Sequence, residues 1–356
     1  GAVSASSAAV DAAAAASGTP VTPAASSAPR WHQVPRVFGR VTAKALGLVI
    51  NVDDPYSVAV GEHYIRARQI PPDHVLRISL PRQPQLSTAD LARLREQVAA
   101  RFDARVQALA LAWVEPYAVA CQSITAAVTL GLDASLCGNT CGKASKSPLF
   151  NSTSATPFRD HGLRPSMLLA APDVAQARAL IDRGVAADRS LGWLGSPPVH
   201  AWYLSTSDGA RNVRASMFPP PGLIARPALQ VHVERSDQLN DKSGIVLLQT
   251  GLARLWPLDS LQFVPGALAD HLTSFGGALT DAHGQSSAMA WIAAGATASY
   301  GTVSEPCNHL QKFPHPQLLL LHYAQGASAV EAYWKSVAWP AQGLFIGEPL
   351  AAPFAR

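Results

Sequence analysis

The chain has 356 residues, of which 48% are hydrophobic and 15% are charged, and its formal net charge is +4. The hydrophobic content excludes disorder over the whole chain. No apolar run reaches the ~18 residues that a bilayer-spanning helix needs, so we expect no membrane span. Basic residues are scattered singly along the sequence, which makes nucleic acid a poor candidate partner.

The first 29 residues differ from the rest in composition. They are almost all Ala, Ser, Pro, Thr, Val and Gly, and Asp11 is the only charged residue among them. Such a segment has little to bury, so we expect residues 1–29 to form a flexible leader. A frayed Ala-rich helix around 11–17 is the alternative. Residues 30–356 are expected to form a single α/β domain.

Strands and helices are predicted to alternate from residue 46 onward. The first half is expected to contain strands at 46–52, 74–80 and 106–114, and helices at 55–68 and from the Ser87 cap to Phe102. This alternation predicts a mostly parallel sheet flanked by helices. Residues 115–163 interrupt the alternation with Gly, Ser, Asn, Thr and Pro, and they hold three of the four cysteines. We interpret them as an irregular insertion that disulfides hold in place.

The alternation resumes after the insertion. Strands are expected at 166–170, 201–205, 244–249, 296–300 and 343–346. Helices are expected at 174–187, 285–294, 317–325 and 328–337.

The four cysteines are Cys121, Cys137, Cys141 and Cys307. An even number, in a chain that begins without Met, favours two disulfides and an oxidising compartment, so we expect a secreted or periplasmic protein. Three pairings are possible, and we favour Cys137–Cys141 with Cys121–Cys307. Zinc is less favoured because Cys137 and Cys141 have no second close pair. A nucleophilic Cys121 is also less favoured than a disulfide.

No cofactor or metal site is expected from the motifs. The first predicted strand is followed by no Walker loop and no G-x-G-x-x-G, and the histidines match no H-E-x-x-H motif. Asn51–Pro55 places two carboxylates at the end of that strand. Asp53 or Asp54 would cap the helix that begins at Pro55, and the alternative is that they bind a cation.

A second polar segment combines an acid, an imidazole and two hydroxyls. Ser274 could act as a nucleophile with His271 as its base, and Asp270 or Glu305 could orient the imidazole. Gly276 and Gly277 would offer oxyanion donors. The structural alternative makes Ser274 a turn former, His271 a half-buried polar residue and Glu305 a carboxylate satisfied by backbone donors. The segment has no G-x-S-x-G elbow.

Several C-terminal motifs resemble those of an uncharacterised family of secreted bacterial proteins. They are Gly295–Pro306, which contains SYGTVSEP, Thr273–Gly277 and the closing segment Leu344–Leu350 with Pro353 and Phe354. Members of that family often have Gly-Asp-Pro where this chain has Glu348. The resemblance covers about residues 45–354.

More remotely, the order of elements is similar to that of the caspase and gingipain class of cysteine peptidases. Those enzymes carry a His-Gly pair after one strand and a catalytic Cys after the next. In chain order these positions fall at 249–251 and within 270–274, where this sequence has Thr250 and no cysteine. The resemblance therefore implies a caspase-like topology without the Cys/His dyad.

Three functions follow from these observations. The first is a pseudo-enzyme that acts by binding or assembly. The second is a serine-type hydrolase that uses Ser274 and His271. The third is a subunit of an extracellular assembly, which the low charge and the leader favour; its partner would be a protein or further copies of the chain.

Overall fold

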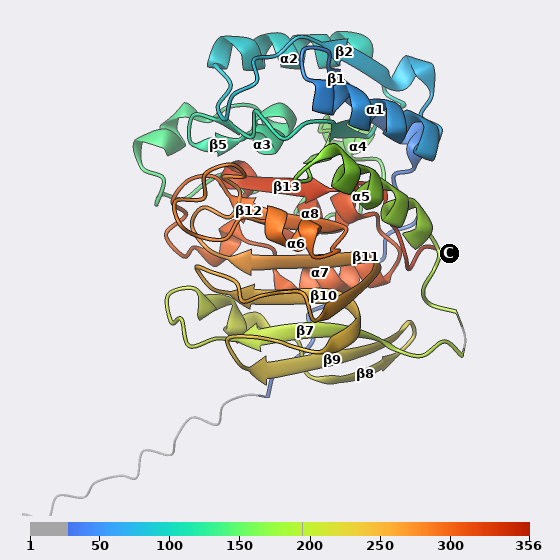
Figure 1. Ribbon diagram of the computed structural model, residues 1–356, viewed down its shortest axis with the longest axis vertical. Coiled ribbons are helices and arrows are strands. Elements are labelled where there is room, and N and C mark those ends of the chain that lie inside the picture. Colours follow the sequence, from blue (N-terminus) through green and yellow to red (C-terminus); the bar gives the residue numbers. More distant parts are fainter. Residues whose placement is uncertain (1–27, 194) are drawn as a thin grey trace, which may run out of the picture.

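The computed structural model describes residues 28–193 and 195–356 (Figure 1). The predicted leader, residues 1–29, therefore lies outside the described residues except for Ala28 and Pro29. The described chain is built around one large mixed sheet with helices on both of its faces. This confirms the predicted α/β class and the mostly parallel sheet.

Eleven strands form the sheet in the order β2-β1-β3-β6-β13-β12-β11-β10-β7-β9-β8. Strand β13 runs antiparallel to β12, and β8 runs antiparallel to β9 at one edge. A separate short hairpin joins β4 and β5. The strands are β1 Leu46–Asn51, β2 Val75–Ile78, β3 Ala108–Leu111, β4 Ala118–Val119, β5 Gln122–Ser123, β6 Ser166–Leu168, β7 Val199–Ser205, β8 Gly222–Ala225, β9 Ala228–Arg235, β10 Lys242–Gly251, β11 Leu261–Leu272, β12 Ala298–Thr302 and β13 Gly343–Gly347.

The helices cover both faces of the sheet. Figure 1 shows α1, α5 and α6 in front of the strands, with α7 and α8 behind them. Helix α3 packs against β6, β13 and α2. No helix in the described part of the chain is long and apolar enough to cross a bilayer. The helices are α1 Pro55–Arg68, α2 Thr88–Arg101, α3 Ile124–Leu130, α4 Pro157–His161, α5 Val174–Ala187, α6 Met289–Ala293, α7 Pro316–Ala324 and α8 Ala329–Ser336.

The most accurate predictions are the helices whose first turn carries a capping side chain. Asp54 accepts a hydrogen bond from the backbone of Tyr56, and Pro55 takes the first helical position of α1. Ser87 caps α2, and Asp173 caps α5 in the same way. These side chains satisfy backbone donors that a helix end leaves free, so they determine where each helix begins.

The patterns miss one central strand. Strand β11 is the longest in the sheet, but no strand is predicted over its residues. Pro265 and Gly266 interrupt its apolar pattern, and Gly266 has a φ of +88°. The pairing of β10 with β11 shifts register in the same region, so the apolar residues do not follow one period.

The insertion at 115–163 is more regular than expected. Ser123 caps α3, a helix of small apolar residues that is buried against the sheet. The segment therefore contributes to the core, and the prediction of an excursion from the sheet is wrong for this helix. The remainder of the insertion is mostly irregular, as predicted.

The disulfides join Cys121 to Cys137 and Cys141 to Cys307. All four cysteines are paired as expected, but the favoured pairing is wrong. Gln122 explains the first bond, because its side chain accepts a hydrogen bond from the backbone of Asp133 at 2.5 Å and draws the next turn back toward Cys121. His309 contacts the Cys141 carbonyl oxygen at 2.7 Å, which brings the loop after β12 to the second bond.

Residues 30–41 run as an extended strap along α7 and α8. Gln317 accepts a hydrogen bond from the backbone of His32 at 2.6 Å and donates one to the carbonyl of Arg30 at 3.1 Å. Gln325 repeats this arrangement with Val37 and Pro35. Each side-chain amide thus pairs with the strap as a neighbouring strand would.

Peptide mapping of the unreduced protein should recover Cys121 linked to Cys137 and Cys141 linked to Cys307. The double variant Cys121→Ser/Cys137→Ser, which opens a loop of 16 residues, should lose about 3 kcal/mol of unfolding free energy. Denaturant unfolding measures this loss. Recovery of a Cys137–Cys141 peptide, or of free thiols, would contradict the assignment.

Gln317→Leu should lower the unfolding free energy by about 1–2 kcal/mol, because two backbone groups of the strap lose their partner. Trypsin should then cut faster at Arg30 and Arg36. Gln262→Leu is a matched control at an exposed position. Equal cleavage rates in the two variants would show that the amide does not hold the strap.

Candidate functional site

The order of strands reverses at β1. From β1 the chain passes outward to β2 and then returns to β3 on the other side of β1. Loops that leave neighbouring strands toward opposite faces of a sheet separate at such a point, and ligands of open α/β sheets bind in the resulting crevice. The residues that directly follow these strands are therefore the first place to look for a site.

A cleft of about 420 Å³ lies at this point. Its lining comes from the loops that follow β1, β2, β3 and β6, together with one residue from the loop after β11. We call it the switch-point cleft, and its residues are Asp54, Tyr56, Arg82, Val114, Glu115, Pro172 and Thr280.

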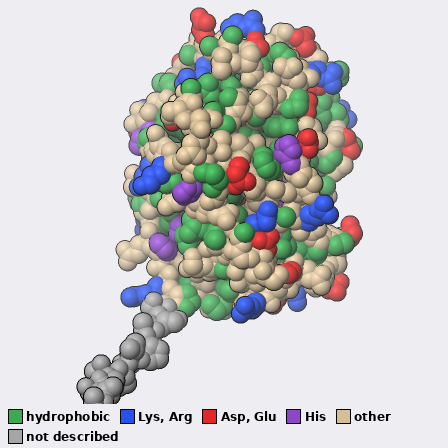
Figure 2. Space-filling view, turned by 90° about the vertical axis from the view of Figure 1, so that its left-hand side faces the viewer, with side chains coloured by type: hydrophobic (Ala, Val, Ile, Leu, Met, Phe, Trp, Pro, Cys, Tyr) green, Lys and Arg blue, Asp and Glu red, His purple; other side chains and the backbone are tan. Residues whose placement is uncertain are grey.

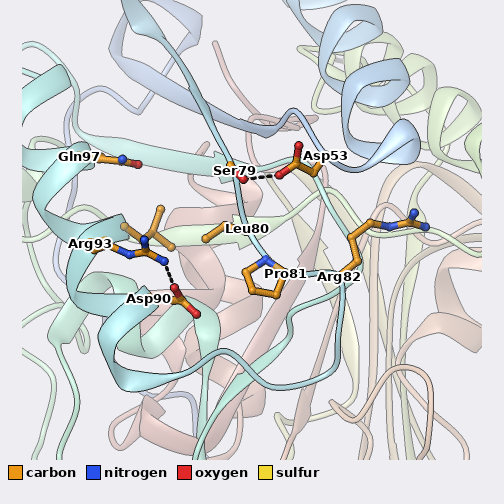
Figure 3. A pocket seen from close by; sticks show the side chains of 9 residues that line it. Asp53, Ser79, Leu80, Pro81, Arg82, Asp90, Arg93 and Gln97 are labelled. Atoms are coloured by element: carbon orange, nitrogen blue, oxygen red, sulfur yellow. Dashed lines mark hydrogen bonds and ion pairs between the residues drawn. The ribbon is translucent and has the colours of Figure 1, made fainter.

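A second hollow, of about 580 Å³, adjoins the cleft on the side of β2. Figure 3 shows Asp53 turned toward Ser79 and Asp90 paired with Arg93, while the Arg82 side chain extends away from that pair. Arg82 lines both hollows and so separates them. The hollow is lined by Asp53, Ser79, Leu80, Pro81, Arg82, Asp90, Arg93, Leu94 and Gln97.

Buried Asn51 fixes the two loops that begin the cleft. Its side-chain amide donates to the carbonyl of Leu80 at 3.0 Å, and its side-chain oxygen accepts from the backbone of Leu80 at 3.0 Å and of Asp53 at 3.2 Å. The loop after β1 and the loop after β2 are therefore tied to the same side chain. Asn51 opens the polar segment Asn51–Pro55 that the sequence singled out, but its role in joining the two loops was not predicted.

Asp54 combines capping with a loose ion pair. Its side chain caps α1, which confirms the capping interpretation of Asn51–Pro55 for this residue. Arg82 approaches the Asp54 carboxylate at 3.5 Å, and the Arg82 side chain is 59% exposed. An exposed guanidinium at this distance adds little stability, so Arg82 is free to exchange Asp54 for another anion.

Glu115 connects two distant loops across the cleft. Its Oε1 accepts a hydrogen bond from the Thr280 hydroxyl at 2.6 Å, so the loop after β3 is joined to the loop after β11. Tyr56 forms a rigid wall, because its hydroxyl donates to the carbonyl of Leu169 and accepts from the backbone of Ala171. Burial raises the pKa of Tyr56, which keeps the phenol protonated.

The predicted base, His271, is buried and fully bonded. Its Nδ1 accepts from the Trp291 indole at 2.9 Å, and its Nε2 donates to the Ser286 carbonyl at 2.9 Å. Burial lowers the pKa of His271 to about 4. Neither ring nitrogen is therefore available to Ser274 in this arrangement.

The other members of the predicted hydrolase site do not join His271. Asp270 is its neighbour in β11 and faces the opposite side of the sheet, where it pairs with Arg214 at 2.7 Å. Glu305 accepts from the backbone of Cys307, as the structural alternative predicted. Ser274 is half-buried, and no hydrogen bond of its hydroxyl is found within the described residues.

The expected oxyanion donors are also partly engaged. The N–H of Gly277 donates to the Thr302 carbonyl at 2.9 Å.

In the described part of the chain, no three His, Cys, Asp or Glu side chains are arranged to hold a metal ion. Figure 2 shows acidic and basic side chains interspersed over the face that corresponds to the left of Figure 1, where β10 and β11 end.

Sequence reasoning missed Arg82, Glu115 and Thr280. Arg82 and Glu115 each lie within four residues of the end of a strand, β2 and β3 respectively. The order β2-β1-β3 would have pointed to them, because ligands of open α/β sheets bind beyond the strand ends at such a reversal. Thr280 belongs to a long loop, and no signal in the sequence indicated its contact with Glu115.

The comparisons add no relative to this description. No family model, no curated protein and no solved structure matches the chain.

His271 gives the stability a defined pH dependence. Since its pKa falls from 6.5 in the unfolded chain to about 4 in the fold, the unfolded state binds the extra proton between these values. The unfolding free energy should be complete above pH ~6.5 and should fall by about 3 kcal/mol as the pH drops to ~4. His315 and His322, whose pKa values burial also lowers, act in the same direction.

Urea unfolding of His271→Gln at several pH values checks this. The variant should be less stable at neutral pH and should lose less stability on acidification. His161→Gln, at an exposed position, is the control. If His271→Gln keeps the full pH dependence, the imidazole is not buried in its neutral form.

Proposed function

We propose that the chain is a secreted or periplasmic binding protein whose switch-point cleft takes a small organic cation. The observation that carries the proposal is the convergence of Asp54 and Glu115, from loops after two different strands, on one cleft where the strand order reverses. Among the described residues that line it, Arg82 is the only basic one. The cleft thus carries a net negative charge.

The way these charges are bonded favours a ligand with an ammonium group. Glu115 accepts a hydrogen bond from the uncharged hydroxyl of Thr280 and has no ion pair within the described residues. The Asp54 carboxylate is held by α1 and meets Arg82 only loosely. An ammonium group placed between them would form two charge-assisted hydrogen bonds while Arg82 turns toward solvent or toward a ligand carboxylate.

The remote likeness to cysteine peptidases supports a binding role over dyad chemistry. Thr250 in β10 lies directly beside His271 in β11. By chain order, the resemblance to the peptidase class would put its His-Gly pair at the end of β10 and its cysteine at the end of β11. The four cysteines are all in disulfides. We propose that the fold shares its ancestry with the caspase-like peptidases. At the positions of their dyad this chain has Thr250 and the segment 270–274, which contains no cysteine.

The compartment is inferred from the cysteines. Two disulfides persist in oxidising surroundings and are rare in the cytosol, which supports the secreted or periplasmic assignment. The assembly alternative depends on the leader, most of which lies outside the described residues.

Calorimetric titration with putrescine tests the cleft, with 1,4-butanediol as the uncharged analogue. We expect putrescine to bind and the diol not to bind. Glu115→Gln keeps an oxygen for Thr280 but removes the charge, so it should weaken putrescine about tenfold or more.

Glu96→Gln is the matched control, because Glu96 is exposed and lines neither hollow. It should leave putrescine affinity unchanged. Absence of binding, equal binding of the diol, or equal effects of the two variants would each overturn the proposal. A calcium titration that displaces putrescine and responds to Glu115→Gln would instead identify an inorganic cation site.

A further inference from the structure

A third hollow, unconnected with the switch-point cleft, lies where the chain leaves α5. It encloses about 330 Å³, within the lower range of small-molecule sites. Three parts of the chain meet there: the connection from α5 to β7, the turn between β8 and β9, and the C-terminal segment beside the end of α7. In Figure 1 the α5–β7 connection runs along the right-hand side, away from the tips of β10 and β11.

We call this hollow the C-terminal groove. Its lining is mainly apolar, with one basic side chain from each of two segments. The residues are Arg189, Leu191, Gly192, Trp193, Pro227, Ala324, Phe354, Ala355 and Arg356.

Backbone hydrogen bonds hold the walls of the groove together. Arg189 donates to the carbonyl of Ala352 at 3.0 Å, and Leu191 donates to that of Pro353 at 2.9 Å. The Phe354 ring packs edge-on against Tyr323, with 6.0 Å between the ring centroids. The C-terminal segment is therefore fixed against the α5–β7 connection, and the groove exists before any ligand arrives.

Trp193 leaves a large apolar surface unburied at the groove. Its side chain is 69% exposed, although most large apolar side chains of the chain are in the core. The indole nitrogen donates to the Arg189 carbonyl at 2.9 Å, which ties one edge of the ring to the wall. A tethered indole beside a preformed hollow offers contact area at a small cost in conformational entropy.

The two charged side chains that line the groove, Arg189 and Arg356, are both basic. No carboxylate pairs with Arg189 or Arg356 among the described residues. Asp188, the neighbour of Arg189 in the sequence, is already bonded to the buried Arg68 at 2.5 Å and to the backbone of Ala352 at 3.1 Å. Within the described residues, the two guanidinium groups thus have no side-chain carboxylate partner at the edge of this apolar hollow.

We propose that the C-terminal groove binds a small amphipathic organic anion, with an apolar body against Trp193 and Phe354 and a carboxylate on Arg189 and Arg356. Guanidinium groups match a carboxylate with paired hydrogen bonds, and the apolar lining removes a short hydrocarbon chain from water. The site is separate from the switch-point cleft and does not depend on the function proposed for it.

Titration of the full chain with octanoate tests the proposal, followed by calorimetry and by tryptophan fluorescence. 1-Octanol has the same chain without the charge, and octylamine carries the opposite charge. We expect octanoate to bind at least about tenfold more tightly than octanol, and octylamine not to bind. Trp193→Ala should weaken octanoate and remove most of the fluorescence change.

The double variant Arg189→Gln/Arg356→Gln should weaken octanoate about tenfold or more. Arg66→Gln/Arg178→Gln removes the same charge from exposed positions on α1 and α5 and should leave binding unchanged. Thermal unfolding of each variant shows whether the fold is retained. No octanoate binding, equal binding of octanoate and octanol, or equal effects of the two double variants would each overturn the proposal.

Discussion

Strand β13 is the element on which the rest of the structure depends. It is the last strand in the chain, but it lies in the interior of the sheet between β6 and β12. Its two ends accept only glycine, because a Cβ at Gly343 would lie 2.0 Å from the hydroxyl oxygen of Tyr300, and one at Gly347 would lie 2.3 Å from the carbonyl oxygen of Thr297. The strand therefore packs closely between β6 and β12 and joins the group β2-β1-β3-β6 to the group β12-β11-β10-β7-β9-β8.

The residue that follows β13 also holds α1, the helix that carries one side of the switch-point cleft. Glu348 is fully buried and accepts hydrogen bonds from Arg68 and Tyr64, each at 2.5 Å. Both donors belong to α1, whose first turn presents Asp54 to the cleft. A buried ion pair adds little net stability, but removing one partner would leave a costly unpaired charge, so the contact fixes α1 relative to the sheet.

How far the sequence predicts this molecule depends on whether the signal is local. The bounds of α1 and α5 agree with the prediction because a capping aspartate and the apolar period lie within one segment. Strand β11 and the disulfide pairing depend on partners far along the chain, and no short pattern reports them. The segment Asn51–Pro55, which the sequence singled out, contains Asp54 of the cleft. Glu115 could be placed at the cleft only once the order of the strands was known. For His271 the local pattern was misleading. Asp270 and His271 are adjacent in the sequence, which suggested a catalytic pair, but their side chains lie on opposite faces of β11.

The late position of β13 has a consequence for how the protein is made. Until residue 343 has been synthesised, β6 and β12 are unprotected edges of two separate sheet fragments. Exposed strand edges recruit strands from other molecules, so the nascent chain is prone to aggregation until β13 has been synthesised. Shielding of those edges by a chaperone or by rapid export would therefore matter most before β13 emerges, and loss of β13 would leave two sheet fragments with unpaired edges.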